Sequence, residues 1–309
     1  MKKQFPSKAF IVMTIIMVAF VQMAKAQLLD NSTGNAFTDR PYFNEKIIKK
    51  NKIKTISGGF IHYKLGDILR ETDYFRQYTF NEEGQLVRQL ESRQVANGQD
   101  TLVSIYEYDA SGNMTALRQR DQYGFYAYTY EYDDQGRVIN EDYRRNLNKN
   151  NTSATNFELG REFTVSSERS SYDNYEGQQK RTIYNSYDIP YKDIFTYYDD
   201  IGLITQRVER LHRTSGTKTT TYSYNEKNLI DTVKVRSNTA GVQNRTSVFA
   251  YDKFDNLVKK EEYKNDEYIT QYQVIYHDET MLINDVLIQN IATNFIMVLE
   301  LRHYTYFDD

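Results

Sequence analysis

One short phrase recurs along this chain after residue 75, and it constrains the fold more than any other feature. It consists of an aromatic residue, usually an acidic residue or asparagine, a short variable stretch often ending in glycine, and an apolar pair. It occupies residues 80–86, 108–114, 132–138 and 198–204, and worn copies begin at Tyr224, Tyr251 and Tyr276. The copies are spaced 24 to 28 residues apart, except for one interval of 66 residues that we interpret as two units with a worn anchor at Tyr172. A fixed period of this kind predicts a repeat architecture.

A single unit shows how the repeat folds. Tyrosines occupy every second position of residues 126–132, which predicts a β-strand. Asp133 then starts a turn through its own side chain, Gly136 supplies the positive φ of a tight loop, and residues 137–143 return. Connections this short make neighbouring strands antiparallel. The sequence therefore predicts an all-β fold, an antiparallel β-meander of repeated β-hairpins that forms a curved extended sheet or an incomplete barrel.

Two copies of the phrase carry a family resemblance. Residues 108–114 read Tyr-Asp-Ala-Ser-Gly-Asn-Met, and residues 251–257 read Tyr-Asp-Lys-Phe-Asp-Asn-Leu. On these residues the chain resembles the YD-repeat (Rhs-type) family, whose units carry a Tyr-Asp-x-x-Gly-Asn-Leu core. The resemblance covers roughly residues 75–290 and implies a β-repeat fold in an exported protein. Large members form shells around a toxin, and this chain is much shorter, so we expect a short Bacteroidetes-like member without a toxin domain.

The first 26 residues have the features of a signal peptide. Three lysines precede an apolar run over residues 9–21, and residues 24–26, Ala-Lys-Ala, fit the small-x-small cleavage pattern. The alternative is an uncleaved membrane anchor, but the run is shorter than the ~20 residues that a bilayer span needs. We therefore expect cleavage after Ala26 and an exported bacterial protein, periplasmic or secreted, with no membrane span after cleavage.

Composition narrows the class further. The chain has no cysteine, which excludes disulfides and a lipidated N-terminal cysteine. The leader carries four lysines, so its removal takes the formal charge from −3 to −7. A mildly acidic protein is a poor partner for nucleic acid, and we expect none. The 28 tyrosines and 16 phenylalanines favour strands.

The mature chain divides into a short segment and one domain. Residues 27–52 are polar, become basic and lack a period, which predicts a flexible segment. Residues 53–309 are expected to form a single YD-like β-repeat domain, and the aliphatic residues 281–307 to form its closing hairpin. The five lysines within residues 46–54 have two interpretations: contact with an anionic polysaccharide or membrane surface, or protection of the first edge strand against pairing with other chains.

Patterns for catalysis and metal binding are weak. Adjacent carboxylates at residues 133–134, 199–200 and 261–262 are candidates for a glycosidase pair, but the first two pairs belong to the repeat turn. No calcium-binding loop occurs, and the four histidines lack metal-ligand spacing. No serine nucleophile elbow is present. We predict that the protein is not an enzyme and has no catalytic residue, metal or cofactor.

Tyrosines give the main indication of function. If the units pair as predicted, tyrosines from several units cover one face of the sheet, where rings stack on sugars and hydroxyls orient them. The alternative is a cross-strand ladder that stabilises the sheet itself. The candidate binding residues are Tyr106, Tyr108, Tyr126, Tyr128, Tyr130, Tyr132, Tyr222 and Tyr224.

These features lead to three hypotheses of function. In the first, the protein is an exported, non-catalytic repeat protein that binds a glycan or an envelope protein through the tyrosine-rich face. In the second, it is a structural envelope scaffold that self-associates through its sheet edges. In the third, it is an extracellular polysaccharide hydrolase.

Overall fold

A computed structural model describes residues 27–64, 66–95, 98–121, 124–148, 159–239 and 241–308, so the predicted signal peptide lies outside the described residues. One short helix, α2 (Glu45–Lys50), precedes a long series of strands. The strands are β1 (Ile53–Lys64), β2 (Arg70–Phe80), β3 (Leu86–Val95), β4 (Gly98–Tyr108), β5 (Met114–Asp121), β6 (Gly124–Tyr132), β7 (Val138–Asn148), β8 (Leu159–Tyr175), β9 (Gln178–Tyr184), β10 (Pro190–Tyr198), β11 (Ile204–Leu211), β12 (Thr217–Tyr224), β13 (Ile230–Ser237), β14 (Arg245–Tyr251), β15 (Leu257–Lys264), β16 (Glu267–Tyr276), β17 (Ile283–Asn290) and β18 (Phe295–Tyr306).

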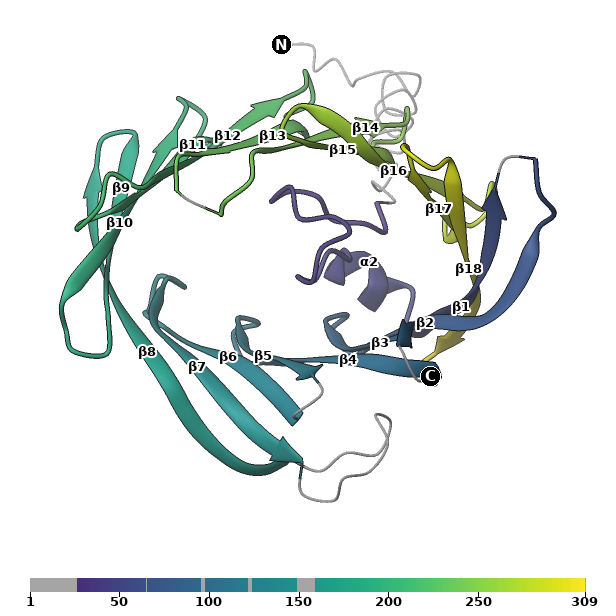
Figure 1. Ribbon diagram of the computed structural model, residues 1–309, viewed down its shortest axis with the longest axis horizontal. Helices are drawn as coiled ribbons and strands as arrows, with labels where there is room; N and C mark the ends of the chain where they lie inside the picture. Colours follow the sequence, from purple (N-terminus) through teal and green to yellow (C-terminus); the bar gives the residue numbers. More distant parts are fainter. Residues whose placement is uncertain are drawn as a thin grey trace, which may run out of the picture.

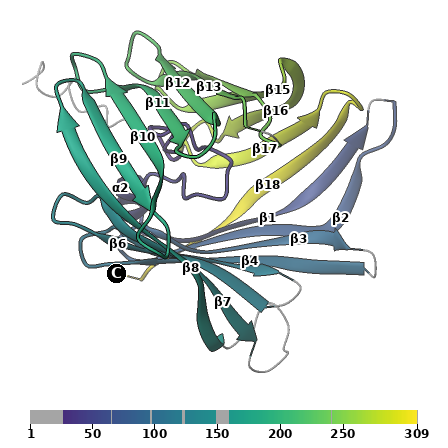
Figure 2. The same ribbon diagram turned by 60° about the vertical axis from the view of Figure 1, so that its left-hand side comes forward.

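The strands form one closed antiparallel sheet. Each pairs with the strands before and after it in the sequence, and β1 pairs with both β2 and β18. The result is an 18-stranded barrel (Figures 1 and 2). The predicted all-β antiparallel meander is confirmed, whereas the predicted open sheet or incomplete barrel is wrong.

Closure removes the sheet edges. The hairpin β17–β18 lies in the predicted closing segment, and it completes the ring by placing Leu299 opposite Phe60 of β1. Among the described strands none keeps an unpaired edge. Self-association through sheet edges therefore loses its structural basis, and the lysines of residues 46–54 have no edge strand to protect.

The repeat phrase builds the turns at one rim of the barrel. The Asp109 carboxylate accepts hydrogen bonds from the main-chain N–H groups of Ser111 at 2.8 Å and Asn113 at 2.9 Å. Gly112 closes the turn with a φ of +87°. In the copy that lacks glycine, Asp255 takes the same position with a φ of +71°. The aspartate and the glycine of the phrase thus each help to form the turn, the first through its side chain and the second through its positive φ. We call this end of the barrel the repeat rim.

The aromatic residue of the phrase has a second task. In five of the copies, at the worn anchor Tyr172 and at Tyr304 of β18, a tyrosine hydroxyl donates a hydrogen bond of 2.6–2.8 Å to a main-chain carbonyl at the start of the return strand of the preceding hairpin. The seven pairs are Tyr108–Leu86, Tyr132–Met114, Tyr172–Val138, Tyr224–Ile204, Tyr251–Ile230, Tyr276–Leu257 and Tyr304–Ile283. These bonds, which we call tyrosine staples, join adjacent hairpins along the repeat rim. The worn anchor predicted at Tyr172 makes such a staple.

Residues 27–52 fold into the barrel and form what we call the plug (Figure 1). Six of its hydrophobic side chains are buried: Leu28, Leu29, Ala36, Tyr42, Phe43 and Ile48. Asn44 caps the short helix α2, and Gly84 lies so close to this helix that a Cβ atom would stand 2.1 Å from the Glu45 carbonyl oxygen. The sequence predicted a flexible segment here; in the structure, isolated apolar residues of this segment pack in the core without any regular period.

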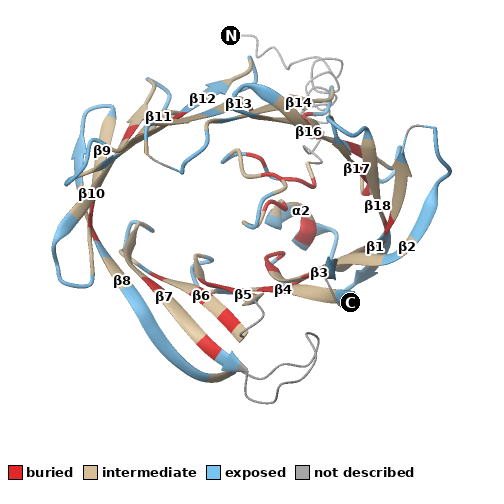
Figure 3. Cartoon of the chain, viewed as in Figure 1, coloured by how far each residue is buried: buried red, intermediate tan, exposed pale blue. Residues whose placement is uncertain are grey.

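The two faces of the sheet differ in character. Residues directly opposite each other on paired strands share a face, and the face that contacts the plug carries most of the core cluster, including Tyr78, Tyr106 and Leu299. Buried positions occur both along the strands and in the plug (Figure 3). The other face points outward. There the opposed residues of β12, β13 and β14 are Thr221, Lys234 and Thr246. The core of the barrel is therefore built between the wall and the plug.

Candidate functional site

Contacts with the plug show which way the tyrosines point. The Tyr106 hydroxyl donates to the Asp39 carbonyl oxygen at 2.9 Å, and the hydroxyls of Tyr42 and Tyr78 lie 2.8 Å apart. Arg40 lies over the ring of Tyr130, 5.5 Å from its centroid. The predicted tyrosine face is therefore the inner wall of the barrel and not an exposed platform.

Six of the eight predicted binding tyrosines have structural partners. Tyr108, Tyr132 and Tyr224 make staples. Tyr106 and Tyr130 are buried by the plug, and Tyr222 packs on the core that the plug completes. These six residues are therefore engaged in structural contacts, with main-chain carbonyls and with the core around the plug. The remaining two, Tyr126 and Tyr128, stay half-buried on the inner wall.

Tyr126 and Tyr128 belong to an aromatic group that we call the tyrosine cluster, together with Tyr143 of the neighbouring strand β7. The Tyr128 and Tyr143 ring centroids lie 5.3 Å apart, and that of Tyr126 lies 6.3 Å from each. The Arg145 guanidinium lies 5.7 Å from the Tyr126 centroid. Burial raises the pKa of Tyr128 above its usual value, so its hydroxyl stays protonated at neutral pH. The cluster offers ring surface and hydroxyl groups to the interior.

A row of polar side chains continues from this cluster across the inner wall. The Tyr126 hydroxyl donates to Gln119 Oε1 at 2.6 Å, and Gln119 Nε2 donates to Ser104 Oγ at 3.2 Å. Gln89 lies opposite Ser104 on the next strand. We call Gln119, Ser104 and Gln89 the polar row. Strand register alone brings these residues, which are distant in sequence, into one line.

The polar row lines a cavity of about 350 Å³ between the wall and the plug, which we call the polar cavity. Phe37, Thr38, Asp39 and Tyr42 of the plug line it from the other side. The Phe37 ring stacks on Tyr272, with centroids 5.0 Å apart and planes at 8°. Ligand pockets of about 300–1,000 Å³ typically combine ring faces with a few converging polar groups. The polar cavity has this composition.

A half-buried ion pair lies beside the polar row. Arg76 Nη2 and Glu91 Oε2 are 2.5 Å apart. Burial by itself lowers the pKa of Arg76, but the nearby Tyr78 and Glu91 raise it well above its usual value. Arg76 therefore stays cationic, and the pair supplies a donor and an acceptor to the same cavity, which both residues line.

The carboxylate pairs named from the sequence do not form a site. Asp133 and Asp199 accept the main-chain bonds of their own turns. Glu261 pairs with Lys259 on the outer wall, whereas Glu262 pairs with Lys260 on the inner wall. Adjacent residues of a strand point to opposite faces, so two neighbouring glutamates of one strand are held apart.

A different pair of carboxylates does meet inside the barrel. Glu141 of β7 lies opposite Glu168 of β8, and the Tyr191 hydroxyl donates to the Glu168 carboxylate. Burial raises the pKa of Glu141; the charge of Arg181 opposes this shift, and the charge of Glu168 adds to it. These groups give the wall beside the tyrosine cluster a mixed charge.

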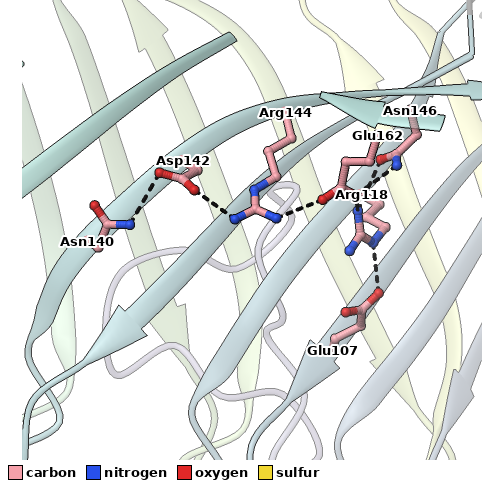
Figure 4. A network of polar contacts seen from close by, with 7 residues as sticks. All are labelled: Glu107, Arg118, Asn140, Asp142, Arg144, Asn146 and Glu162. Atoms are coloured by element: carbon pink, nitrogen blue, oxygen red, sulfur yellow. Dashed lines mark hydrogen bonds and ion pairs between the residues drawn. The ribbon is translucent and has the colours of Figure 1, made fainter. Parts of the chain in front are cut away.

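The outer wall of the same strands carries a self-contained polar network (Figure 4). Arg118 reaches Glu107 at 2.8 Å and Glu162 at 3.0 Å, and Arg144 bridges Glu162 and Asp142 at 2.7 Å each. Burial by itself raises the pKa of Glu162, but hydrogen bonds from Arg144 and Asn146 and the charge of Arg118 lower it to about 2. The network pairs its own charges and therefore has a structural role.

Metal-ligand geometry is absent from the described residues, where no three histidine or acidic side chains converge on one point. None of the helices in the described part of the chain has the length and apolar character of a transmembrane helix.

Sequence reasoning missed most of the residues that line the polar cavity. Gln89, Ser104 and Gln119 come from three strands, and none stands in the repeat phrase. Ser104 lies two residues before the inward Tyr106 on the same strand, whereas Gln89 and Gln119 lie opposite Tyr78 and Tyr126 on neighbouring strands. Finding them required the register of the strands, which the phrase does not specify residue by residue.

No protein-family model matches the chain, and no curated protein matches it. Solved structures with a similar arrangement include a porin-like protein from Bacteroides uniformis, 11% identical, with a TM-score of 0.36, covering 83% of this chain and 97% of that one. A LolA superfamily protein from Nitrosomonas europaea, 11% identical, covers 84% of this chain and 91% of that one with a TM-score of 0.19. The TcdB2-TccC3-Cdc42 structure, 10% identical, covers 77% of this chain but 15% of that one, with a TM-score of 0.28. These scores are too low to carry an argument about fold or function.

Proposed function

We propose that the protein is an exported barrel that binds a saccharide inside its lumen, without catalysing a reaction. The observation that carries this proposal is the polar cavity, whose polar row is connected to the neighbouring tyrosine cluster by the hydrogen bond from the Tyr126 hydroxyl to Gln119. The predicted tyrosine-rich face thus keeps its proposed role at two of its residues, Tyr126 and Tyr128. Because this face points inward, a glycan suits it better than a folded protein partner.

The chemistry of the lining residues supports a sugar. Gln89 and Gln119 each carry an amide donor and acceptor, which suit hydroxyl groups that donate and accept. Tyr272 lines the same cavity, and burial raises its pKa to about 12, so its hydroxyl is a donor at neutral pH. Ring faces at Phe37 and in the tyrosine cluster supply stacking surface.

The setting also fits an exported protein. The N-terminal 26 residues carry the pattern of a cleaved leader, and cysteine is absent from the sequence. The outward threonines and lysine of β12–β14 suit an aqueous surrounding. The resemblance to the YD-repeat family points to export in the same way.

The test is a thermal shift screen of the mature chain, residues 27–309, against purified envelope and dietary polysaccharides and their oligosaccharides. A saccharide that binds the folded state raises the melting temperature by mass action. The shift is expected to disappear in Tyr128→Ala and in Gln89→Ala. The matched control is Tyr263→Ala, which removes a tyrosine that stacks on Tyr268 at 5.0 Å on the outer wall.

Two outcomes contradict the proposal. One is a flat melting temperature across the whole panel. The other is a shift that Tyr263→Ala abolishes while Tyr128→Ala and Gln89→Ala leave it unchanged, because binding would then take place on the outer wall.

A further inference from the structure

A second cavity adjoins the polar cavity and shares four of its lining residues. Its volume is about 280 Å³, and we call it the apolar cavity. The residues that line the apolar cavity but not the polar cavity include Phe60, His62 and Tyr74. Both cavities are lined by Ile288 and Met297. The His62 ring stacks on Tyr74 with centroids 5.9 Å apart, and burial lowers the pKa of His62, which favours the neutral ring. The walls therefore present ring and aliphatic carbon.

Two polar side chains that line only the apolar cavity, Ser92 and Gln94, are already hydrogen-bonded. Ser92 Oγ accepts a hydrogen bond from the Phe75 N–H at 2.5 Å and donates to the Phe75 carbonyl at 3.2 Å. The Gln94 side chain accepts a hydrogen bond from the Tyr74 hydroxyl. A ligand in this cavity would find few free hydrogen-bonding groups, in contrast to the polar cavity beside it.

The boundary between the cavities has a free donor. Arg76 and Glu91 line both cavities. Arg76 bonds Glu91 through Nη2, but its Nε is buried and has no hydrogen-bond partner among the described residues. Leaving a buried donor unpaired is unfavourable, because the donor has lost its hydrogen bonds to water. An acceptor oxygen at this boundary would recover that cost.

We propose that the two cavities together hold one amphipathic ligand, a saccharide whose linking oxygen joins it to an apolar chain or ring. The sugar occupies the polar cavity, the linking oxygen accepts from Arg76 Nε, and the apolar group occupies the apolar cavity. This inference rests on the proposed saccharide function and names the class of saccharide: an alkyl or aryl glycoside, or a sugar ester.

The experiment is isothermal titration of residues 27–309 with methyl β-D-glucopyranoside and n-octyl β-D-glucopyranoside, the latter below its micelle concentration. The octyl compound is expected to bind at least about tenfold more tightly, which corresponds to about 1.4 kcal/mol. His62→Trp, which fills the apolar cavity, should remove this advantage. The control is Tyr63→Trp, on the outward face of the same strand. A competition in the wild-type protein, in which n-octanol displaces the octyl compound, needs no variant and guards against a misfolded His62→Trp.

The outcomes separate the two proposals. Equal affinity for the methyl and octyl compounds, or no competition by n-octanol, overturns the amphipathic ligand even if the saccharide screen succeeds. If no saccharide in the screen binds, yet n-octanol binds and His62→Trp blocks it, saccharide binding is contradicted and the apolar cavity stands as a site. A tenfold advantage lost in His62→Trp, with the glucoside also weakened by Gln89→Ala, supports both.

Discussion

The same repeat unit lines two very different halves of one barrel. In the plugged half, strands β12–β18 and β1–β6, the inner wall is aromatic and packs on the plug, as Tyr78 and Tyr272 do. In the open half, strands β7–β11, the inner wall carries charged groups such as Glu141, Glu168 and Glu209. The turns and strands follow one pattern in both halves. The repeat therefore specifies the strands and turns of the barrel wall. Packing on the plug then determines which inward residues are structural and which are available to a ligand.

The largest expected difference between the halves is at two equivalent glycines of the repeat rim. Gly84 and Gly202 have φ values of +84° and +85°. An added Cβ at Gly84 would stand 2.1 Å from the Glu45 carbonyl oxygen of the plug, whereas at Gly202 it would meet nothing within 4 Å. Gly202→Ala should cost about 1–2 kcal/mol for the left-handed backbone alone. Gly84→Ala should cost about 4 kcal/mol or more, because the helix must also move. Urea unfolding of both variants measures the difference, and equal losses would contradict a seated plug.

A buried lysine provides the next comparison. Lys260 is 2% exposed, donates to the Ala36 carbonyl oxygen of the plug at 2.9 Å and pairs with Glu262 at 2.7 Å. Lys260→Met leaves both partners unsatisfied, so the free energy of unfolding should fall by about 3 kcal/mol. Its neighbour Lys259 pairs with Glu261 on the outer wall, and Lys259→Met should cost less than about 1 kcal/mol. Similar losses in the two variants would mean that Lys260 does not anchor the plug.

A smaller effect is expected from a staple. The Tyr276 hydroxyl donates to the Leu257 carbonyl oxygen at 2.8 Å. Tyr276→Phe removes this bond, and should lower the free energy of unfolding by about 1 kcal/mol. Tyr263→Phe removes an outer-wall hydroxyl that bonds Glu261 at 3.1 Å and should change stability by less than half as much. The ratio of the two losses, from chemical unfolding, tests whether the repeat tyrosine stabilises the rim.

The smallest effect is expected in acid, on the outer wall of the open half. The pKa of Glu162 is lowered to about 2 in the folded state, against about 4.3 in an unfolded chain. A depressed carboxylate contributes stability above its unfolded pKa, and loses this contribution as the pH falls toward its folded pKa. The difference in melting temperature between wild type and Glu162→Gln should therefore shrink as the pH falls from about 5 to about 2. A difference that stays constant over this range would argue against the ion-pair network.

The sequence indicated the local structure well because the repeat phrase is local chemistry. The side chain of Asp109 and the φ of Gly112 form a turn without help from distant residues. Closure was not predictable in this way. It pairs β1 with β18, at opposite ends of the domain, and the two strands carry no short-range signal of each other.

The site was predictable only in part. Tyrosine alternation placed Tyr126 and Tyr128 on one face, but the side of the sheet that becomes the interior depends on closure. The plug was missed because Leu28, Ala36 and Ile48 have no helical or strand period, and each is buried by a contact with the wall. The polar cavity exists only once wall and plug are assembled.

The most direct test of the account is amide hydrogen exchange of the mature chain, read at the plug. The Ile48 N–H donates to the Asn44 carbonyl and the Asn51 N–H to the Ile47 carbonyl inside the closed barrel. The account predicts that these amides exchange as slowly as those of β17 and β18, and that Gly84→Ala accelerates them selectively. Exchange of residues 27–52 at the rate of a free peptide, with the strands still protected, would contradict a plug seated in the barrel and the cavities that depend on it.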